Sequence, residues 1–136
     1  MKETIVRWAG GQRFIGTDSS KHSVIMSTRD EGIGVSPSEL LMIALSACSS
    51  VDVVGILEKK KKKLTSLEVV ASGEQNEDPP WAYNKINLKF IVKGSGLTEK
   101  DVAKAIELSE EKYCSVAATV RGVAEITTEF EIISED

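Results

Sequence analysis

The sequence contains few of the residues from which most enzyme sites are built. It has one histidine, His22, and two cysteines, Cys48 and Cys114, in 136 residues. No CxxC or CxxH spacing occurs, which argues against a metal site. A Ser-His or Cys-His triad is nearly excluded too, because His22 would have to be its base. Neither GxGxxG nor a Walker-type GxxxxGKS or GxxxxGKT is present, so we expect no metal and no nucleotide cofactor.

The composition is that of an ordinary globular protein. The chain is 41% hydrophobic and 28% charged, and 136 residues predict a single domain over 1–136. The net charge of -4 gives no support to nucleic-acid binding. The N-terminus, MKETIVRWAGG, lacks the apolar stretch of a secretory signal. We therefore expect a cytoplasmic protein, where a disulfide would be transient and not structural.

One long apolar helix is expected from Pro37 to about Lys60. Ser36 as N-cap, Pro37 at the first position and Glu39 three residues after Ser36 form the start signal of a helix. The stretch 40–57 has nearly the length of a membrane span. Its polar residues make a helix buried in protein the better interpretation and predict no membrane insertion; they are Ser46, Ser49, Ser50 and Asp52.

The other elements predict an α+β fold with a mainly antiparallel sheet. Strands are grouped before and after helices and do not alternate with them. The expected strands are 3–9, 12–17, 22–28, 64–74, 83–94 and 123–133, and the expected helices are 98–113 and a short turn in 115–122. A helix as apolar as 37–60 needs more cover than one small sheet provides. We therefore expect a partner subunit to complete its burial in a homodimer.

The two cysteines allow two interpretations from the residues alone. A free cysteine commonly packs as a small buried apolar residue, so both could be inert. Against this, the polar residues around Cys48 imply a cleft or interface along its helix. Cys114 ends one expected helix and opens the next, where a helix N-terminus lowers a thiol pKa. Which of the two thiols is the better nucleophile stays open at this point.

Three segments resemble the OsmC/Ohr family of organic hydroperoxide-reducing proteins. They are VSPSELLMIALSACSSVDVVGIL, INLKFIVKG and LSEEKYCSVAATV, and the resemblance covers nearly the whole chain. It is closest to a less-characterised OsmC-related branch. The family fold is an intertwined homodimer in which the sheet wraps around a long buried central helix, with sites at the subunit interface.

The resemblance also implies a chemistry for the cysteines. Cys48 would be the peroxidatic thiolate, which becomes a sulfenic acid on attacking the hydroperoxide. Cys114 would resolve it as a disulfide, which an external dithiol then reduces. Neither metal, haem nor flavin is required. The expected function is thiol-dependent reduction of alkyl hydroperoxides in oxidative stress defence.

The family also requires an arginine beside the thiolate. Arg13 follows the Gly10-Gly11 turn and is our preferred candidate, with Arg29, in TRDEG, as the alternative. The peroxidases carry a glutamate directly after the helix-opening proline, where it pairs with the arginine. Here Glu39 stands one position later, and one helical position rotates a side chain by about 100°.

The displaced glutamate motivates a second hypothesis. Glu39 would then serve only to cap the helix, and the chain would be a non-catalytic OsmC-like domain that binds a small apolar ligand or a partner. Two further features have structural interpretations. The lysine run 59–63 predicts a solvated helix end. Trp81 and Tyr83 predict core or dimer contacts, or the lining of an apolar pocket.

Overall fold

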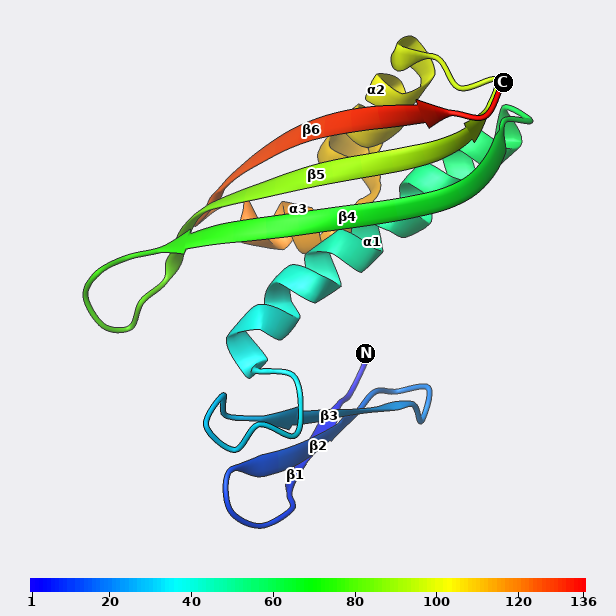
Figure 1. Cartoon of the computed structure of the whole chain (residues 1–136). Coiled ribbons are helices and arrows are strands. Elements are labelled where there is room, and N and C mark those ends of the chain that lie inside the picture. Colours follow the sequence, from blue (N-terminus) through cyan, green and yellow to red (C-terminus); the bar gives the residue numbers. More distant parts are fainter. The chain divides into compact units, whose positions relative to one another are not determined.

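The computed structural model describes residues 1–136, and the chain forms two compact units, Met1–Leu41 and Met42–Asp136 (Figure 1). Each unit contains one three-stranded sheet. The mixed α+β composition confirms the predicted fold class. That the two units act as one domain stays a prediction.

The first unit is an antiparallel sheet with the order β1-β2-β3. Its strands are β1 (Ile5–Trp8), β2 (Arg13–Thr17) and β3 (Ser23–Ser27), within the ranges expected from the sequence. The turn between β1 and β2 contains Gly10 and Gly11 at φ 92° and 53°, a backbone region that disfavours residues with a Cβ. This glycine pair places Arg13 at the first position of β2.

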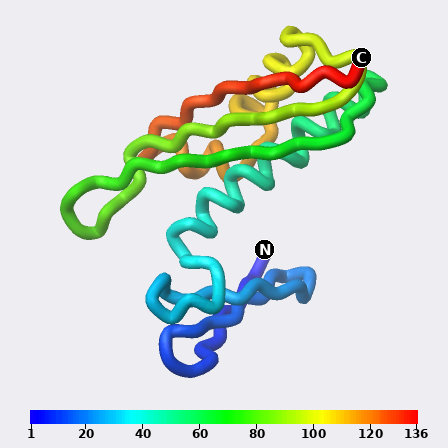
Figure 2. The backbone as a smooth tube through the Cα atoms, in the orientation of Figure 1, coloured from blue at the N-terminus to red at the C-terminus, as the bar shows by residue number.

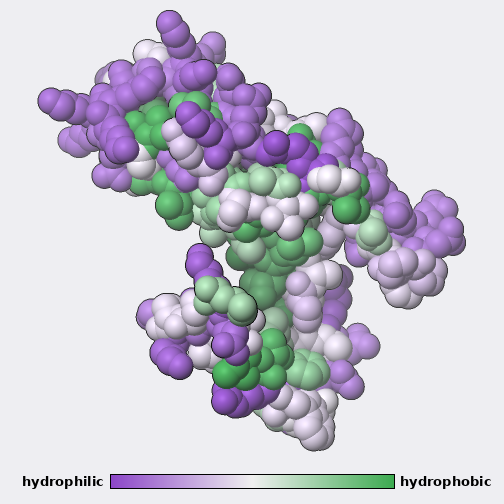
Figure 3. Space-filling model, turned by 180° about the vertical axis from the view of Figure 1, so that it is seen from behind, coloured by the Kyte–Doolittle hydropathy of each residue, from purple (hydrophilic) through white to green (hydrophobic).

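Helix α1 (Pro37–Lys59) starts at the predicted residue and ends one residue earlier than expected. Within the single chain only one stripe is buried, namely Leu45, Ser49, Val53 and Leu57. That a partner subunit completes the burial of the helix stays a prediction. Hydrophobic side chains remain exposed on the surface (Figure 3), among them Leu41, Ile43 and Val51 of α1.

By length and composition alone, α1 would also be able to cross a membrane. The core helix of a soluble protein meets the same criterion. Asp52 lies in the middle of α1 and its carboxylate accepts a hydrogen bond from Ser109 at 2.8 Å. A charge at this depth is costly in a bilayer, whereas here it has a protein partner.

The second unit holds a sheet with the order β4-β5-β6. The strands β4 (Lys63–Gln75) and β5 (Tyr83–Ser95) pair antiparallel, as predicted, and their connecting loop extends past the end of the sheet (Figure 2). β6 (Glu125–Ser134) pairs parallel to β5. The parallel pairing follows from the helical segment between them, which returns the chain to the start of the sheet.

That crossover consists of three pieces. α2 (Glu99–Leu108) ends five residues before the predicted helix end and continues as a π-helical turn, η1 (Ser109–Tyr113). A short helix, α3 (Ser115–Val120), follows after Cys114. The helices lie on one face of the sheet (Figure 1). The core between them is formed by alternate residues of β5, namely Ile86, Leu88, Phe90 and Val92, and by residues of α1, α2 and α3.

Two minor expectations come out differently in the structure. The lysine run is only partly solvated, because Lys60 and Lys62 both pair with Asp101 of α2, at 3.3 and 3.1 Å. Trp81 is exposed in the single chain, whereas Tyr83 is half-buried and packs against the core. The aromatic pair therefore does not act as one core contact.

Candidate active site

The second unit brings the two cysteines together. Cys48 lies on α1 and is half-buried, and Cys114 lies between η1 and α3 and is buried. Both are free thiols. The two thiols lie close enough for each to shift the pKa of the other. The fold thus makes a pair of residues that lie far apart in the sequence.

The start of α3 surrounds the sulfur of Cys48 with hydrogen-bond donors. The backbone N–H groups of Ser115 and Val116 and the hydroxyl of Ser115 all interact with it. Burial raises the pKa of the Cys48 thiol, but these donors and the Cys114 thiol outweigh it, so that the pKa lies below its ordinary value. A lowered thiol pKa is the property of a nucleophilic cysteine.

Cys114 has the opposite electrostatics. Burial, together with the neighbouring Cys48, raises the pKa of its thiol to about 11, although the Ala117 amide opposes the shift. Its Sγ accepts a hydrogen bond from the backbone N–H of Ala117 at 3.3 Å, so the side chain caps α3. Amides of the first turn of α3 therefore lower the pKa of both thiols, but they outweigh the effect of burial only at Cys48.

No pattern in the sequence indicated the residues that create this environment. Ser115 follows Cys114 directly, but nothing in the sequence indicated that its hydroxyl and amide face a residue of α1. A second missed feature is a chain of polar residues beneath the cysteines, which joins Ser49 and Asp52 of α1 to Ser109. The serines within the apolar helix were the only sign of it.

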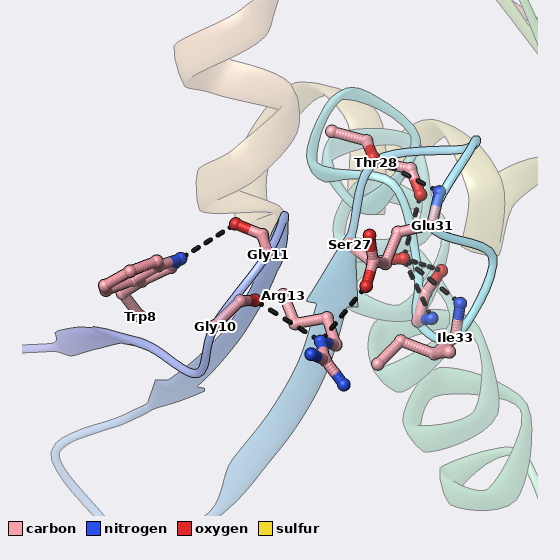
Figure 4. Close-up of polar contacts among 9 residues, drawn as sticks. Trp8, Gly10, Gly11, Arg13, Ser27, Thr28, Glu31 and Ile33 are labelled. Atoms are coloured by element: carbon pink, nitrogen blue, oxygen red, sulfur yellow. Dashed lines mark hydrogen bonds and ion pairs between the residues drawn. The ribbon is translucent and has the colours of Figure 1, made fainter.

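The first unit contains both candidate arginines, and each pairs with a glutamate. Arg13 forms an ion pair with Glu31 at 3.1 Å, and its Nε donates to the carbonyl oxygen of Gly10 at 3.3 Å (Figure 4). In the same loop region, Trp8 Nε1 donates to the carbonyl oxygen of Gly11 at 2.8 Å. The side chain of Arg13 is thus held by Gly10, in the turn between β1 and β2, and by Glu31, in the loop between β3 and α1. Glu31 was not singled out from the sequence.

Buried Ser27 anchors the loop that carries Glu31. Its Oγ accepts hydrogen bonds from the backbone N–H groups of Ile33 and Gly34 at 3.3 and 3.0 Å (Figure 4). The same hydroxyl donates to the carbonyl oxygen of Thr28 at 2.9 Å. Because both ends of the loop converge on one side chain, the position of Glu31 is well defined relative to Arg13.

Arg29 is the arginine that meets Glu39. Their ion pair measures 3.4 Å, and the Arg29 side chain is 84% exposed. Glu39 also accepts a hydrogen bond from the hydroxyl of Ser36 at 2.6 Å. That bond, and then Arg29, lower the pKa of the Glu39 carboxyl. Glu39 therefore both closes the start of α1 and binds an arginine, so the two roles weighed from the sequence do not exclude one another.

A cavity of about 490 Å³ opens one turn along α1 from Cys48. Asp52 and the η1 residue Tyr113 contribute to its wall, and most of the remaining lining is apolar, with two lysines at one end: Val51, Gly55, Ile56, Lys59, Lys60 and Leu108. No group of three or more histidine, cysteine or acidic side chains is placed to hold a metal ion.

The order of elements and the paired cysteines can now be compared with known proteins. The family described as OsmC-like protein matches residues 29–129. The chain belongs to the OsmC-like family. It is 37% identical over 129 residues to Protein YhfA of Escherichia coli (strain K12), with 95% of this chain and 96% of YhfA covered.

Solved structures confirm that the OsmC-like fold extends over the whole chain. A hypothetical protein from Aquifex aeolicus VF5 has a TM-score of 0.90 at 29% identity, with 100% of this chain and 98% of that chain covered. The organic hydroperoxide resistance protein OhrB of Bacillus subtilis has a TM-score of 0.63 at 14% identity, with 96% and 98% covered. The likeness to OhrB concerns the fold alone.

Proposed function

We propose that this OsmC-like protein reduces organic hydroperoxides with a pair of cysteines, Cys48 as the attacking thiolate and Cys114 as the resolving thiol. One observation carries the proposal: the two thiols interact directly, and their pKa values move in opposite directions. A pair of inert core cysteines gives no reason for one thiol to be surrounded by four hydrogen-bond donors.

The chemistry balances with two thiols and one hydroperoxide. The Cys48 thiolate attacks the distal oxygen of ROOH, the O–O bond breaks, and the alkoxide leaves and takes up a proton as ROH. Cys48 is then a sulfenic acid. The Cys114 sulfur attacks the Cys48 sulfur, and its proton leaves with the hydroxyl group as water. An external dithiol restores both thiols by exchange, so no bound cofactor takes part in the cycle.

The donors around Cys48 support each stage of this cycle. In the resting protein they stabilise negative charge on the sulfur, which raises the fraction of thiolate at neutral pH. The raised pKa of Cys114 keeps that sulfur protonated at rest. The proposed cycle requires a thiolate at Cys48 and a thiol at Cys114, because only the attacking sulfur must be ionised at the start.

We further propose that an arginine stabilises the Cys48 thiolate, as the family resemblance implies, and we assign this role to Arg13. Its guanidinium is oriented by Glu31 and by the carbonyl of Gly10, whereas Arg29 is mostly solvated. A guanidinium beside a thiolate stabilises the charge and polarises the departing oxygen of the peroxide. In this assignment Glu39 and Arg29 stabilise the start of α1, and Glu31 takes the place of the family's glutamate.

We also propose a cytoplasmic homodimer. The exposed apolar side chains of α1 are the support, because three of them on one helix are costly to leave in water: Leu41, Ile43 and Val51. The first sheet likewise exposes Val6, Trp8 and Ile25. A second copy of the chain would cover such surfaces, as expected for an OsmC-like fold.

A second candidate function is that of a non-catalytic OsmC-like domain. The cavity beside Asp52 favours it, because its size and largely apolar lining suit a small ligand. The bond from Ser36 to Glu39 also agrees with a glutamate used as a helix cap. In this case the cysteines would stay reduced when hydroperoxide is added.

The experiment that decides between them counts thiols before and after one equivalent of cumene hydroperoxide. The peroxidase proposal expects the loss of two thiols per chain, with a Cys48–Cys114 disulfide found by mass spectrometry. Cys48→Ser should abolish hydroperoxide consumption with dithiothreitol or a dihydrolipoyl donor. If the wild type keeps both thiols and shows no turnover, the peroxidase proposal is overturned. The non-catalytic binding domain is then the remaining hypothesis.

A further inference from the structure

A chain of three polar side chains links α1 to η1. Ser49 and Ser109 are both fully buried, within a core that is otherwise apolar. Their hydroxyl oxygens lie 3.0 Å apart, and the hydroxyl of Ser109 donates to Asp52 Oδ2 at 2.8 Å. Because each hydroxyl has one hydrogen and Ser109 uses its own for Asp52, the remaining bond runs from Ser49 to Ser109.

The backbone of Ser109 connects this chain to Cys114. Its carbonyl oxygen accepts the N–H of Cys114 at 2.9 Å, the bond that closes the π-helical turn. Its own N–H bonds back to the carbonyls of Ala105 and Ile106 in α2. One residue is therefore held by α2 through its amide and by α1 through its side chain, and it holds Cys114 through its carbonyl.

The other end of the chain lies next to Cys48 in α1. Ser49 directly follows Cys48, and Asp52 lies one helical turn further on. The polar chain therefore connects the helix of the attacking cysteine to the turn of the resolving cysteine by hydrogen bonds and not only by apolar packing. Apolar packing tolerates small displacements of one element against another, whereas a buried polar network makes all of its hydrogen bonds in one arrangement.

We propose that Asp52, Ser109 and Ser49 are positioning residues for disulfide formation: they hold Cys114 and the start of α3 in line with the sulfur of Cys48. This inference rests on the proposed function, because it concerns the resolving step. That step requires the Cys114 sulfur to approach along the S–O bond of the Cys48 sulfenic acid. A misplacement of about 1 Å can slow such a reaction by about 100-fold.

The test uses four variants and one matched control. Ser109→Ala removes the central hydroxyl and both of its bonds. Asp52→Ala removes the acceptor, whereas Asp52→Asn keeps an oxygen that can accept from Ser109. Ser49→Ala removes the outermost hydroxyl alone. Ser50→Ala is the control, since the Ser50 hydroxyl bonds only within α1, to the carbonyl of Ser46 at 2.7 Å.

The first measurement needs no hydroperoxide. Each protein is equilibrated with reduced and oxidised glutathione, and the effective concentration of the Cys48–Cys114 pair is obtained from the fraction of disulfide. We expect a fall of about tenfold or more for Ser109→Ala and Asp52→Ala. Asp52→Asn and Ser50→Ala should keep the effective concentration of the wild type. Ser49→Ala should give a value between that of the wild type and that of Ser109→Ala. Wild-type values for both Ser109→Ala and Asp52→Ala would overturn the proposal.

The second measurement separates positioning from loss of structure. After cumene hydroperoxide, the sulfenic acid of Cys48 is trapped with dimedone in competition with Cys114. The trapped fraction should rise in Ser109→Ala and Asp52→Ala, while their far-ultraviolet circular dichroism spectra stay at that of the wild type. If Ser109→Ala does not fold, the comparison of Asp52→Ala with Asp52→Asn decides: equal behaviour of the two would contradict the inference.

The two measurements also distinguish this inference from the proposed function. A wild type that forms the disulfide with glutathione but ignores hydroperoxide would end the peroxidase proposal. The role of the polar chain would then still be decided by the glutathione values. A wild type that forms no Cys48–Cys114 disulfide under any oxidant would overturn both.

Discussion

Cys48 and Cys114 form a thiol pair in which each residue shifts the pKa of the other. Burial opposes ionisation of both, but the Cys114 thiol donates to Cys48 and lowers its pKa, while Cys48 raises that of Cys114. The asymmetry originates in α3, whose first amides face Cys48. Reactivity at this site is therefore a property of the pair and of the helix start together.

The first prediction concerns the pH dependence of alkylation. Cys48 should react with iodoacetamide at a pH below the range of an ordinary thiol, because its pKa is lowered, whereas Cys114 should react only near pH 11 or after unfolding.

Two variants at Cys114 test its effect on Cys48. In Cys114→Ser, a serine hydroxyl can still donate to Cys48, so the alkylation profile of Cys48 should change little. In Cys114→Ala this donor is absent, and the Cys48 profile should move to higher pH. Peptide mapping of the labelled thiols checks this, and equal labelling of both native cysteines would contradict it.

A second prediction concerns the arginine that serves Cys48. If Arg13 has the proposed role, Arg13→Met should raise the pKa of Cys48, since loss of a cation that acts on the thiolate disfavours it. It should also slow hydroperoxide consumption. Arg29→Met is the matched control and should leave both quantities unchanged, because that side chain is 84% exposed. The reverse result would transfer the role to Arg29 and Glu39.

Glu31 gives a related, third prediction. Glu31→Gln keeps the volume of the side chain but removes the charge that holds Arg13 at 3.1 Å. We expect the hydroperoxide rate to fall by less than in Arg13→Met, with the thiol pKa of Cys48 moving in the same direction. Glu39→Gln should leave the Cys48 alkylation profile at its wild-type position. An effect of Glu39→Gln larger than that of Glu31→Gln would show that the family's glutamate position still serves the site.

The fourth prediction tests the proposed homodimer. Val51 is 72% exposed on α1, and an aspartate at this position should prevent a second copy from covering the helix. We expect Val51→Asp to shift the mass measured by light scattering from dimer to monomer. Val123→Asp places the same charge at a 75% exposed residue outside α1 and should leave the mass unchanged. A wild type that is monomeric at micromolar concentration would exclude the dimer.

The last prediction is about stability alone. Thr98 is the N-cap of α2, and its hydroxyl accepts from the backbone N–H of Asp101 at 3.1 Å. Thr98→Ala should lower the free energy of unfolding by about 1 kcal/mol, whereas Thr98→Ser should retain most of it. Urea denaturation of the reduced protein measures both. Equal stability of Thr98→Ala and the wild type would mean that the cap adds nothing to α2.

The boundaries of α1 could be predicted from the sequence because its start signal is local. Ser36, Pro37 and Glu39 lie within four residues, and the Ser36 hydroxyl donates to the Glu39 carboxylate, which links the two side chains of the predicted start signal. The alternation of Ile86, Leu88 and Phe90 likewise predicted a strand with one buried face. In each case the determining contacts are made by residues close together in the chain.

The surroundings of Cys48 could not be predicted in this way. They depend on how far α2 continues before the chain turns, and the sequence from Ser109 to Tyr113 favours a regular helix as much as a π-helical turn. The parallel pairing of β6 with β5 has the same origin, because it depends on where the crossover returns the chain. Residues such as Glu31 and Ser115 acquire a role only through contacts that these non-local choices create.

The π-helical turn also makes the site sensitive to the length of the chain at one place. A π-turn contains one residue more than an α-helical turn over the same rise. Deleting a single residue between Ser109 and Tyr113 would restore a regular helix and rotate everything after it by about 100°. The N–H of Cys114 would then no longer meet the carbonyl of Ser109, which it now contacts at 2.9 Å. Alignments of OsmC-like chains should therefore treat a one-residue gap here as a change of the thiol pair itself.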